Sequence, residues 1–268
     1  MATLDQPTAL AQLDVDDLRG KVQHMYDAVA RHPHDGHFHF EIGRALAERL
    51  GYPAGDLDRV PAPAIESFAG VGYHFDLAAL QPGERVIDLG SGSGMDSFVA
   101  ALQVGATGRV IGIDMTDAQR EKASELSRRA GVAHAEFRPG LIEEIPLGTG
   151  EADCVISNGV INLCPEKTRV FTEVARVLQP GGRLALSDIV TDRPLPSNVT
   201  CNATLWAACI GGAAQQDAYR AAIETAGLSV VSIRENSAYA FLSKSAQNAS
   251  REYGVKSISL LAVKGAGR

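Results

Sequence analysis

The segment at residues 84–116, ERVIDLGSGSGMDSFVAALQVGATGRVIGIDMT, decides the fold of this chain. It begins with an apolar run, Val86–Ile87, which predicts a buried strand. The run breaks at a glycine-rich turn, Gly90–Gly94, and a helix is expected near Phe98–Val104. A second buried strand follows and ends in an acid, Asp114. A strand, a glycine-rich turn, a helix and a strand that ends in an acid are typical of a nucleotide-binding βαβ unit.

The spacing of the glycines indicates which nucleotide is bound. A dinucleotide fingerprint requires G-x-G-x-x-G, but Met95 stands where its third glycine belongs. The order D-x-G-x-G-x-G, with Asp88 ahead of the turn, instead resembles motif I of class I S-adenosylmethionine methyltransferases. That resemblance implies that Asp88 helps to hold the amino-acid end of the cofactor. Asp114 is expected to accept hydrogen bonds from the ribose hydroxyls. The alternative is a tight turn in another α/β fold.

Other cofactor contacts are expected where later strands end, because ligands of open parallel sheets bind outside the carboxyl ends of the strands. Met115 is expected against the adenine, or else in plain strand-end packing. Glu143 is placed to accept the adenine amino group, unless it is a solvated residue beside Glu144. The expected cofactor site consists of Asp88, Gly90, Ser91, Gly92, Gly94, Asp114, Met115, Ile142, Glu143 and Ser157.

The composition is that of an ordinary globular protein. The chain has 268 residues, 45% of them hydrophobic and 21% charged, with a net charge of −7. This acidic balance gives no reason to expect a nucleic-acid partner. We expect no membrane span, a cytoplasmic location, reduced cysteines, and a monomer or homodimer.

Strand and helix patterns alternate regularly from residue 84 to 190, which predicts a doubly wound parallel sheet, the class I methyltransferase α/β fold. We expect a helical lid at 1–80, a Rossmann-like core at 81–190 and a C-terminal cap at 191–268 that completes the sheet. Further expected elements are helices at 16–32, 41–50, 117–130, 165–178, 202–210, 215–226 and 243–252, strands at 134–138, 153–157, 183–189, 228–234 and 256–263, a loop at 53–63 and a turn at 180–182.

From about Gly70 to Lys264 the chain resembles the arsenite methyltransferase branch of this superfamily. The segments that carry the resemblance are VIDLGSGSGMDSFVAA, GRVIGIDMT, DCVISNGVINLCPEKTRVFTEVARVLQPGGRLALSDIV, LWAACIGGA and YGVKSISL. The resemblance implies that trivalent arsenic is bound by cysteine thiolates, and Cys209 matches one such position. Val71 and Gly159 stand where the family has two others, and the N-terminal cysteine pair is also absent.

Two interpretations of the acceptor site follow. Cys164 and Cys201 could join Cys209 in a relocated three-thiol arsenic site, although buried cysteines are commonly small apolar residues. Cys154, inside a strand, is expected to be such a residue.

The second interpretation is a pocket remodelled for an organic acceptor. It rests on aromatic and imidazole side chains in the segments where the family has thiols. The alternative for these side chains is packing within a lid. They are Tyr26, His37, His39, Phe40, Tyr73, His74 and Trp206. Asn158 and Asn162 are either structural or substrate contacts. The acceptor candidates are Cys209, His37, His39, Tyr73 and Asn158.

We therefore expect an S-adenosylmethionine-dependent methyltransferase that acts on a small molecule. A genuine arsenite methyltransferase, another alkyl transfer or an intramolecular cyclisation of the cofactor, and a non-catalytic cofactor-binding protein remain open. The histidines at positions 32, 34, 37 and 39 alternate in an extended segment, which is more typical of a surface than of a metal site, and no metal is predicted.

Overall fold

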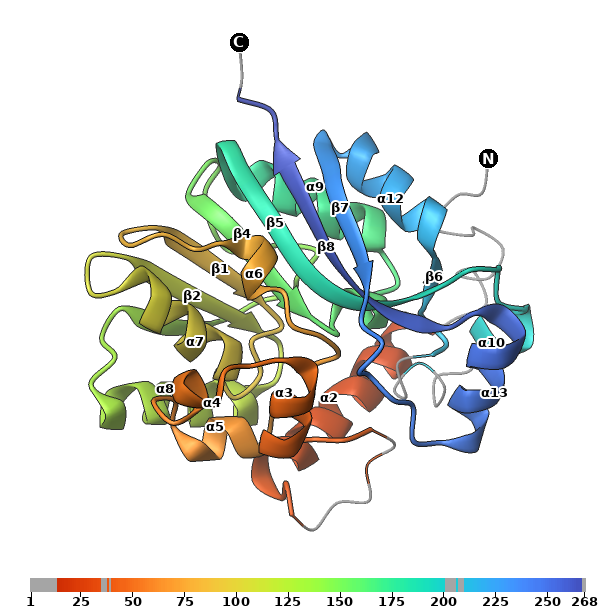
Figure 1. Cartoon of the computed structure of the whole chain (residues 1–268), viewed down its shortest axis with the longest axis horizontal. Coiled ribbons are helices and arrows are strands. Elements are labelled where there is room, and N and C mark those ends of the chain that lie inside the picture. The colour runs from red at the N-terminus through yellow and green to blue at the C-terminus, as the bar shows by residue number, and fades with distance from the viewer. Residues whose placement is uncertain (1–13, 35–37, 39, 201–205, 207–209, 267–268) are drawn as a thin grey trace.

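The computed structural model describes residues 14–34, 38, 40–200, 206 and 210–266. Its centre is one twisted sheet with the strand order β3-β2-β1-β4-β5-β8-β7, and β6 pairs with β5 (Figure 1). The strands are β1 Arg85–Leu89, β2 Arg109–Asp114, β3 Ala135–Pro139, β4 Ala152–Asn158, β5 Leu178–Thr191, β6 Ala214–Gln215, β7 Leu228–Glu235 and β8 Lys256–Lys264.

The strands β3, β2, β1, β4 and β5 are parallel, which confirms the doubly wound α/β fold. β1 lies between β2 and β4, where Asp88 pairs with Gly112 on one side and Ile156 on the other. The carboxyl ends of these strands therefore meet at one edge of the sheet, where Leu89 pairs with Ile113 and Asp114 follows as the last residue of β2. The last two long strands, β8 and β7, run antiparallel and close the sheet.

β5 differs from its expected strand, because it begins at Leu178 and runs through the predicted turn at 180–182. Leu178 pairs with Ala152, and the ladder then shifts register before Cys154 pairs with Arg183. Gly181 has a φ of 79° within this irregular stretch. The local sequence predicts a turn, whereas pairing with β4 carries the chain through it as an irregular strand.

Helices cover both faces of the sheet. They are α2 Val15–Arg31, α3 Arg44–Leu50, α4 Ala54–Leu57, α5 Ala62–Glu66, α6 Phe75–Ala78, α7 Met95–Val104, α8 Asp117–Ala130, the short 3₁₀ helix η1 Ile161–Leu163, α9 Lys167–Val177, α10 Ser197–Thr200, α12 Gln216–Thr225 and α13 Lys244–Tyr253. Successive residues of a strand point to opposite faces. Val86 accordingly joins the core formed with α7, and Ile87 joins the core formed with α9 and α12. This two-sided burial explains the continuous apolar runs that identify the strands.

The N-terminal helices differ in detail from the expected pattern. α3 begins at Arg44 because Gly43, with a φ of 90°, precedes it as the N-cap. The expected loop at 53–63 contains α4 and the start of α5, which begin directly after Pro53 and Pro61. Proline is well tolerated at the start of a helix because its missing N–H is not needed there, so a proline-rich stretch can hold short helices. The helix expected at 202–210 falls mostly outside the described residues.

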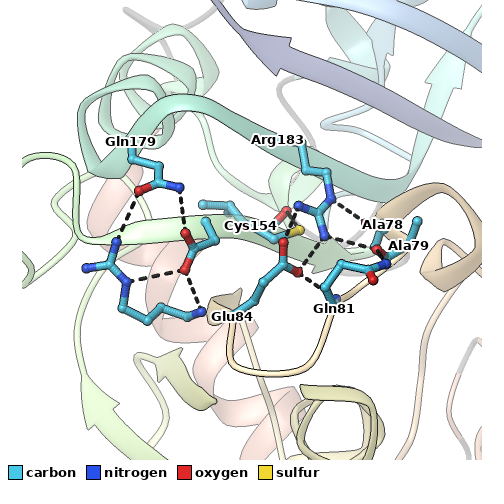
Figure 2. Close-up of polar contacts among 10 residues, drawn as sticks. Ala78, Ala79, Gln81, Glu84, Cys154, Gln179 and Arg183 are labelled. Carbon is cyan, nitrogen blue, oxygen red and sulfur yellow. Dashed lines mark hydrogen bonds and ion pairs between the residues drawn. The ribbon is translucent and has the colours of Figure 1, made fainter. Parts of the chain in front are cut away.

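A partly buried polar network joins strands at the amino-terminal edge of the sheet (Figure 2). Arg183 of β5 forms a forked pair with Glu84, with N–O distances of 2.8 and 2.6 Å, and also donates to the carbonyl of Ala78. Beside it, Asp153 accepts from the Gln179 amide at 2.6 Å and the Arg85 backbone N–H at 2.7 Å. These contacts join β1, β4, β5 and the end of α6 at the edge opposite Asp88 and Asp114.

None of the helices in the described ranges combines the length and the apolar composition that crossing a bilayer requires. Cys154 is fully buried within β4, as expected for a small apolar residue.

Candidate cofactor and acceptor site

A cleft of about 1090 Å³, including the space at its mouth, opens where the parallel strands end. One wall consists of the turns that follow β1, β2, β3 and β4. The opposite wall comes from α2, whose Arg19, Val22 and Tyr26 recur at helical spacing and all face the cleft.

Most of the predicted cofactor residues line this cleft: Asp88, Gly90, Ser91, Gly92, Asp114, Met115, Ile142 and Glu143. Gly94 and Ser157 lie behind this lining. Gly94 is the N-cap of α7, with a φ of 92°, and the buried Ser157 hydroxyl donates to the Leu89 carbonyl at 3.2 Å. Both therefore hold the backbone on which the lining residues stand.

The glycine-rich turn approaches its neighbours too closely for side chains. Gly90 has a φ of 68°, and a Cβ there would fall 2.4 Å from Val160 Cγ2. Next to it, the Ser91 hydroxyl is buried and has no hydrogen-bond partner in the described part of the chain. A buried hydroxyl that lines a cleft without a partner is a natural contact for a ligand, because leaving it unpaired is costly.

Asp114 organises the turn at the end of β2. Its carboxylate accepts the Gly92 N–H at 2.9 Å and the Thr116 N–H at 2.8 Å. Burial raises the pKa of Asp114, and these two bonds act in the opposite direction. Each oxygen has a further lone pair, so the carboxylate retains acceptor capacity toward the cleft.

Two buried carboxylates lie at the base of the cleft. Asp88 is 2% exposed and accepts the Ser97 hydroxyl at 2.6 Å, and Asp96, in the first turn of α7, is 6% exposed. Burial, followed by the charge of Asp96, raises the pKa of Asp88 to about 8. This end of the cleft is therefore suited to a cation, which would relieve the repulsion between the two acids.

Asn158 at the end of β4 forms hydrogen bonds with three other segments of the chain. Its Oδ1 accepts the N–H of Val71 at 2.8 Å and that of Gly72 at 3.3 Å. Its Nδ2 lies 3.0 Å from each of three acceptors: Tyr52 Oη, the Gly72 carbonyl and Asp96 Oδ2. Asn158 lines the cleft, but its polar atoms are occupied by the protein. A second amide, Asn162, is fully buried and faces Asp188 at 2.8 Å and the Gly159 carbonyl at 3.1 Å.

Glu143 is buried and contacts both walls of the cleft. Arg19 of α2 donates to Glu143 Oε1 at 2.5 Å, and the Cys164 thiol donates to Glu143 Oε2 at 3.6 Å. Burial, followed by the nearby Glu143 charge, raises the pKa of Cys164 to about 12. Cys164 is therefore a protonated thiol at neutral pH, and it points at Glu143.

The acceptor candidates are dispersed. Tyr73 lies outside the lining of the cleft, because its ring packs edge-on against Tyr52, with centroids 5.0 Å apart, and against Phe75. Cys209, His37 and His39, as well as Cys201, lie outside the described residues. The two positions without the family thiols do meet: a Cβ at Gly159 would fall 3.1 Å from Val71 Cγ1. Val71 is 1% exposed and packs in an apolar cluster with Leu163 and Trp206.

Sequence reasoning missed three polar residues that line the cleft, Arg19, Asp96 and Gln119, and Tyr52, which holds Asp96 from behind the lining. Asp96 carries a local signal, since it is an acid two residues after the last glycine, in the first turn of a helix. Arg19 and Tyr52 carry none, because they reach their partners Glu143 and Asp96 across 124 and 44 residues of sequence.

The comparisons with known proteins agree with this geometry. A family model described as a methyltransferase domain matches residues 80–227. The arsenite methyltransferase of Halobacterium salinarum is 38% identical over 242 residues, which cover 85% of this chain and 62% of that protein. The human arsenite methyltransferase is 41% identical over 141 residues, covering 48% of this chain and 36% of that protein. The chain thus spans less than two thirds of the length of these relatives.

Solved structures show the same fold. The arsenic(III) S-adenosylmethionine methyltransferase of Chlamydomonas reinhardtii superposes with a TM-score of 0.65 at 31% identity, over 84% of this chain and 74% of that one. A geranyl diphosphate methyltransferase in complex with geranyl diphosphate and sinefungin has a TM-score of 0.66 over 92% of this chain and 99% of that one. It is 18% identical and shows the fold alone. The chain therefore belongs to the methyltransferase-domain family, has the class I methyltransferase fold and resembles the arsenite methyltransferases.

Proposed function

We propose that this protein transfers a methyl group from S-adenosylmethionine to a small organic acceptor, which is held against an apolar wall where the arsenite methyltransferases have thiols. The observation that carries the proposal is that the Val71 methyl groups lie against the Cβ position of Gly159, a residue that lines a cleft with the features of a cofactor site.

The residues of the cleft fit S-adenosylmethionine. Asp114 has acceptor capacity for the ribose hydroxyls, the Gly90 turn allows close backbone approach, and Ser91 offers an unpaired hydroxyl. Asp88 would face the cationic amino-acid end, and Glu143 would accept the adenine amino group. When bound, the cofactor supplies a methyl group on a sulfonium sulfur, and this sulfur is a good leaving group. The protein then mainly needs to align the acceptor and exclude water.

Helix α2 supports the exclusion of water, and we include it in the proposal as a lid. It closes one side of the cleft and is held by polar contacts to the opposite wall: Gln23 donates to the Met115 carbonyl at 3.3 Å, and Gln119 donates to the Tyr26 carbonyl at 2.9 Å. Arg19 adds the ion pair with Glu143. A cleft covered in this way strengthens the electrostatic interactions inside it.

The acceptor wall favours carbon-rich substrates over arsenic. Trivalent arsenic is soft and requires thiolates, whereas Val71 fills the space beside Gly159 with methyl groups. Cys164 does not compensate, because its thiol points at Glu143 and its pKa is raised to about 12. Both observations count against a thiolate site for arsenic, and the apolar side chains of Val160 and Leu163 in the lining support an acceptor held by apolar contact.

The test is to incubate the full chain with S-adenosylmethionine, arsenite and a thiol and to search for methylarsenicals by mass spectrometry. A parallel incubation replaces arsenite with a panel of small phenols, amines and organic thiols and follows transfer of a labelled methyl group. We expect labelled product from the organic panel and no methylarsenicals. Abundant methylarsenicals that disappear in Cys209→Ser would contradict the organic acceptor and support the arsenite alternative.

A further inference from the structure

A buried polar cluster at the base of the cleft joins the expected cofactor site to the acceptor wall. The Tyr52 hydroxyl donates to Asp96 Oδ1 at 2.6 Å, and Asn158 Nδ2 donates to Asp96 Oδ2 at 3.0 Å. Tyr52 is 3% exposed and its ring packs in the core with Phe68 and Phe75. Asp96 is thus fixed from two sides while it lines the cleft.

The charge of Asp96 has no cationic partner within this cluster. Its hydrogen-bond donors are a phenol and an amide, and its neighbour is a second buried acid, Asp88, whose ionisation the charge of Asp96 opposes. Burying two carboxylates side by side is costly unless a cation joins them. A separate observation indicates that a ligand belongs here: the buried Ser91 hydroxyl lines the same cleft without a partner in the described residues.

On its other side, the cluster binds the backbone of the acceptor wall through Asn158. Asn158 accepts the Val71 N–H at 2.8 Å and the Gly72 N–H at 3.3 Å, so the amide that touches Asp96 also fixes the loop that carries Val71. The loop has no room to shift toward Asn158, since a Cβ at Gly70 would already fall 2.6 Å from Asn158 Nδ2. A change in the position or charge of Asp96 would therefore be transmitted to Val71 through one side chain.

We propose that Asp96, held by Tyr52 and Asn158, is a second carboxylate for the cationic end of the cofactor, and that this contact couples cofactor binding to the loop 70–72 of the acceptor wall. The proposal rests on the cofactor site proposed above. Asp96 contacts the cofactor directly, whereas Tyr52 and Asn158 are positioning residues.

The experiment compares two ligands of the full chain by calorimetry. S-adenosylhomocysteine carries the ammonium group, and 5′-methylthioadenosine has the same adenosine and sulfur without the amino-acid part. The variants are Asp96→Asn and the milder Tyr52→Phe. The matched control is Tyr219→Phe, since Tyr219 is also a buried tyrosine whose hydroxyl donates to a buried aspartate, Asp188, at 2.7 Å. Neither Tyr219 nor Asp188 lines the cleft.

We expect Asp96→Asn to weaken the binding of S-adenosylhomocysteine about 10- to 100-fold, since hydrogen bonds to charged groups are the stronger ones. Tyr52→Phe should weaken it about 3- to 10-fold. Binding of 5′-methylthioadenosine should change less than about twofold in both variants, and Tyr219→Phe should leave both ligands unaffected. In the wild-type chain, S-adenosylhomocysteine should slow amide exchange in a peptide that spans residues 69–74. Tyr52→Phe should reduce this slowing, which a merely structural role of the hydroxyl would not do.

Equal losses for both ligands, or full retention of the exchange effect in Asp96→Asn and Tyr52→Phe, would overturn the inference while leaving the cofactor site intact. A wild-type chain that binds neither ligand would refute the proposed function itself. The two failures are therefore distinguishable in one set of titrations.

Discussion

At the amino-terminal edge of the sheet, Arg183 and Glu84 form a forked ion pair, and Arg183 also donates to the Ala78 and Ala79 carbonyls. At the carboxyl edge, Asp88 and Asp96 are buried side by side, and their protein partners are hydroxyl and amide groups. The same strands connect the two edges, so the difference does not come from the fold. Removing one partner from a satisfied charge pair is costly, whereas buried acids without a cation cost stability that a ligand can restore. We infer from this difference that the amino-terminal edge contributes to stability and the carboxyl edge to binding.

The largest effect on stability is expected at the amino-terminal edge. Arg183→Ala would leave Glu84 largely buried without its partner, and should lower the free energy of unfolding by about 2–3 kcal/mol. Urea denaturation followed by circular dichroism measures this. The matched control is Arg85→Ala, whose ion pair with Asp153 is more exposed and should cost less than about 1 kcal/mol. Equal losses in the two variants would show that the forked pair has no special role.

Asp88→Asn should have opposite effects on binding and on stability. It removes the charge expected to face the cofactor and should weaken S-adenosylhomocysteine about 10- to 100-fold. It also removes a buried carboxylate with a raised pKa, and should increase the free energy of unfolding by about 1 kcal/mol. Calorimetry and urea denaturation of one preparation provide both values. A variant that loses stability along with affinity would contradict the proposed division between the edges.

The affinity for S-adenosylhomocysteine should depend on pH. In the free protein Asp88 is protonated below a pKa of about 8, and a bound cation favours its ionised form, so binding releases a proton. Affinity should therefore increase roughly tenfold from pH 6.5 to 8. The groups that face Asp88 are Asp96 and Asp114, and the nearby buried His74 is neutral, because burial lowers its pKa. Titrations over this range should show a slope that disappears in Asp88→Asn, and a slope that persists there would assign the proton to another group.

The smallest effect is expected at the proposed lid. Arg19→Ala removes the ion pair between α2 and Glu143 but leaves the apolar face of the helix in place. Because Arg19 is partly exposed, the free energy of unfolding should fall by less than about 1 kcal/mol. The dissociation rate of S-adenosylhomocysteine should increase about two- to fivefold. Stopped-flow displacement measures this rate. Lys21→Ala, an exposed change on the same helix, is the control, and an equal acceleration there would refute the role of Arg19.

The sequence predicts those parts of the molecule that depend on local pattern. The parallel half of the sheet follows from apolar runs between helical periods, and the turn Gly90–Gly94 follows from glycine spacing. Both rest on interactions within a few residues. The turn predicted at 180–182 was wrong, because pairing with β4 continues β5 through it. The short helices α4 and α5 among the prolines were missed, because packing decides them.

The candidate site divides in the same way. Asp88 and Asp114 are found from the motif because each lies at the end of a strand. Arg19 reaches the cleft, and Tyr52 reaches the cleft residue Asp96, from segments that no local pattern connects to the site. The contact of Val71 with Gly159 is likewise long-range, although both positions drew attention through the resemblance to arsenite methyltransferases.

The contrast between the two edges is tested most directly by titrating S-adenosylhomocysteine into the wild-type chain, Asp114→Ala and Arg183→Ala by calorimetry. Asp117→Ala, an exposed acid three residues after Asp114, serves as the matched control. We predict one site in the wild type, a loss of at least about 30-fold in Asp114→Ala, and unchanged affinity in Arg183→Ala and Asp117→Ala. Wild-type binding that Asp114→Ala leaves intact, or that Arg183→Ala abolishes at a temperature where the variant is folded, would contradict the assignment of binding to the carboxyl edge.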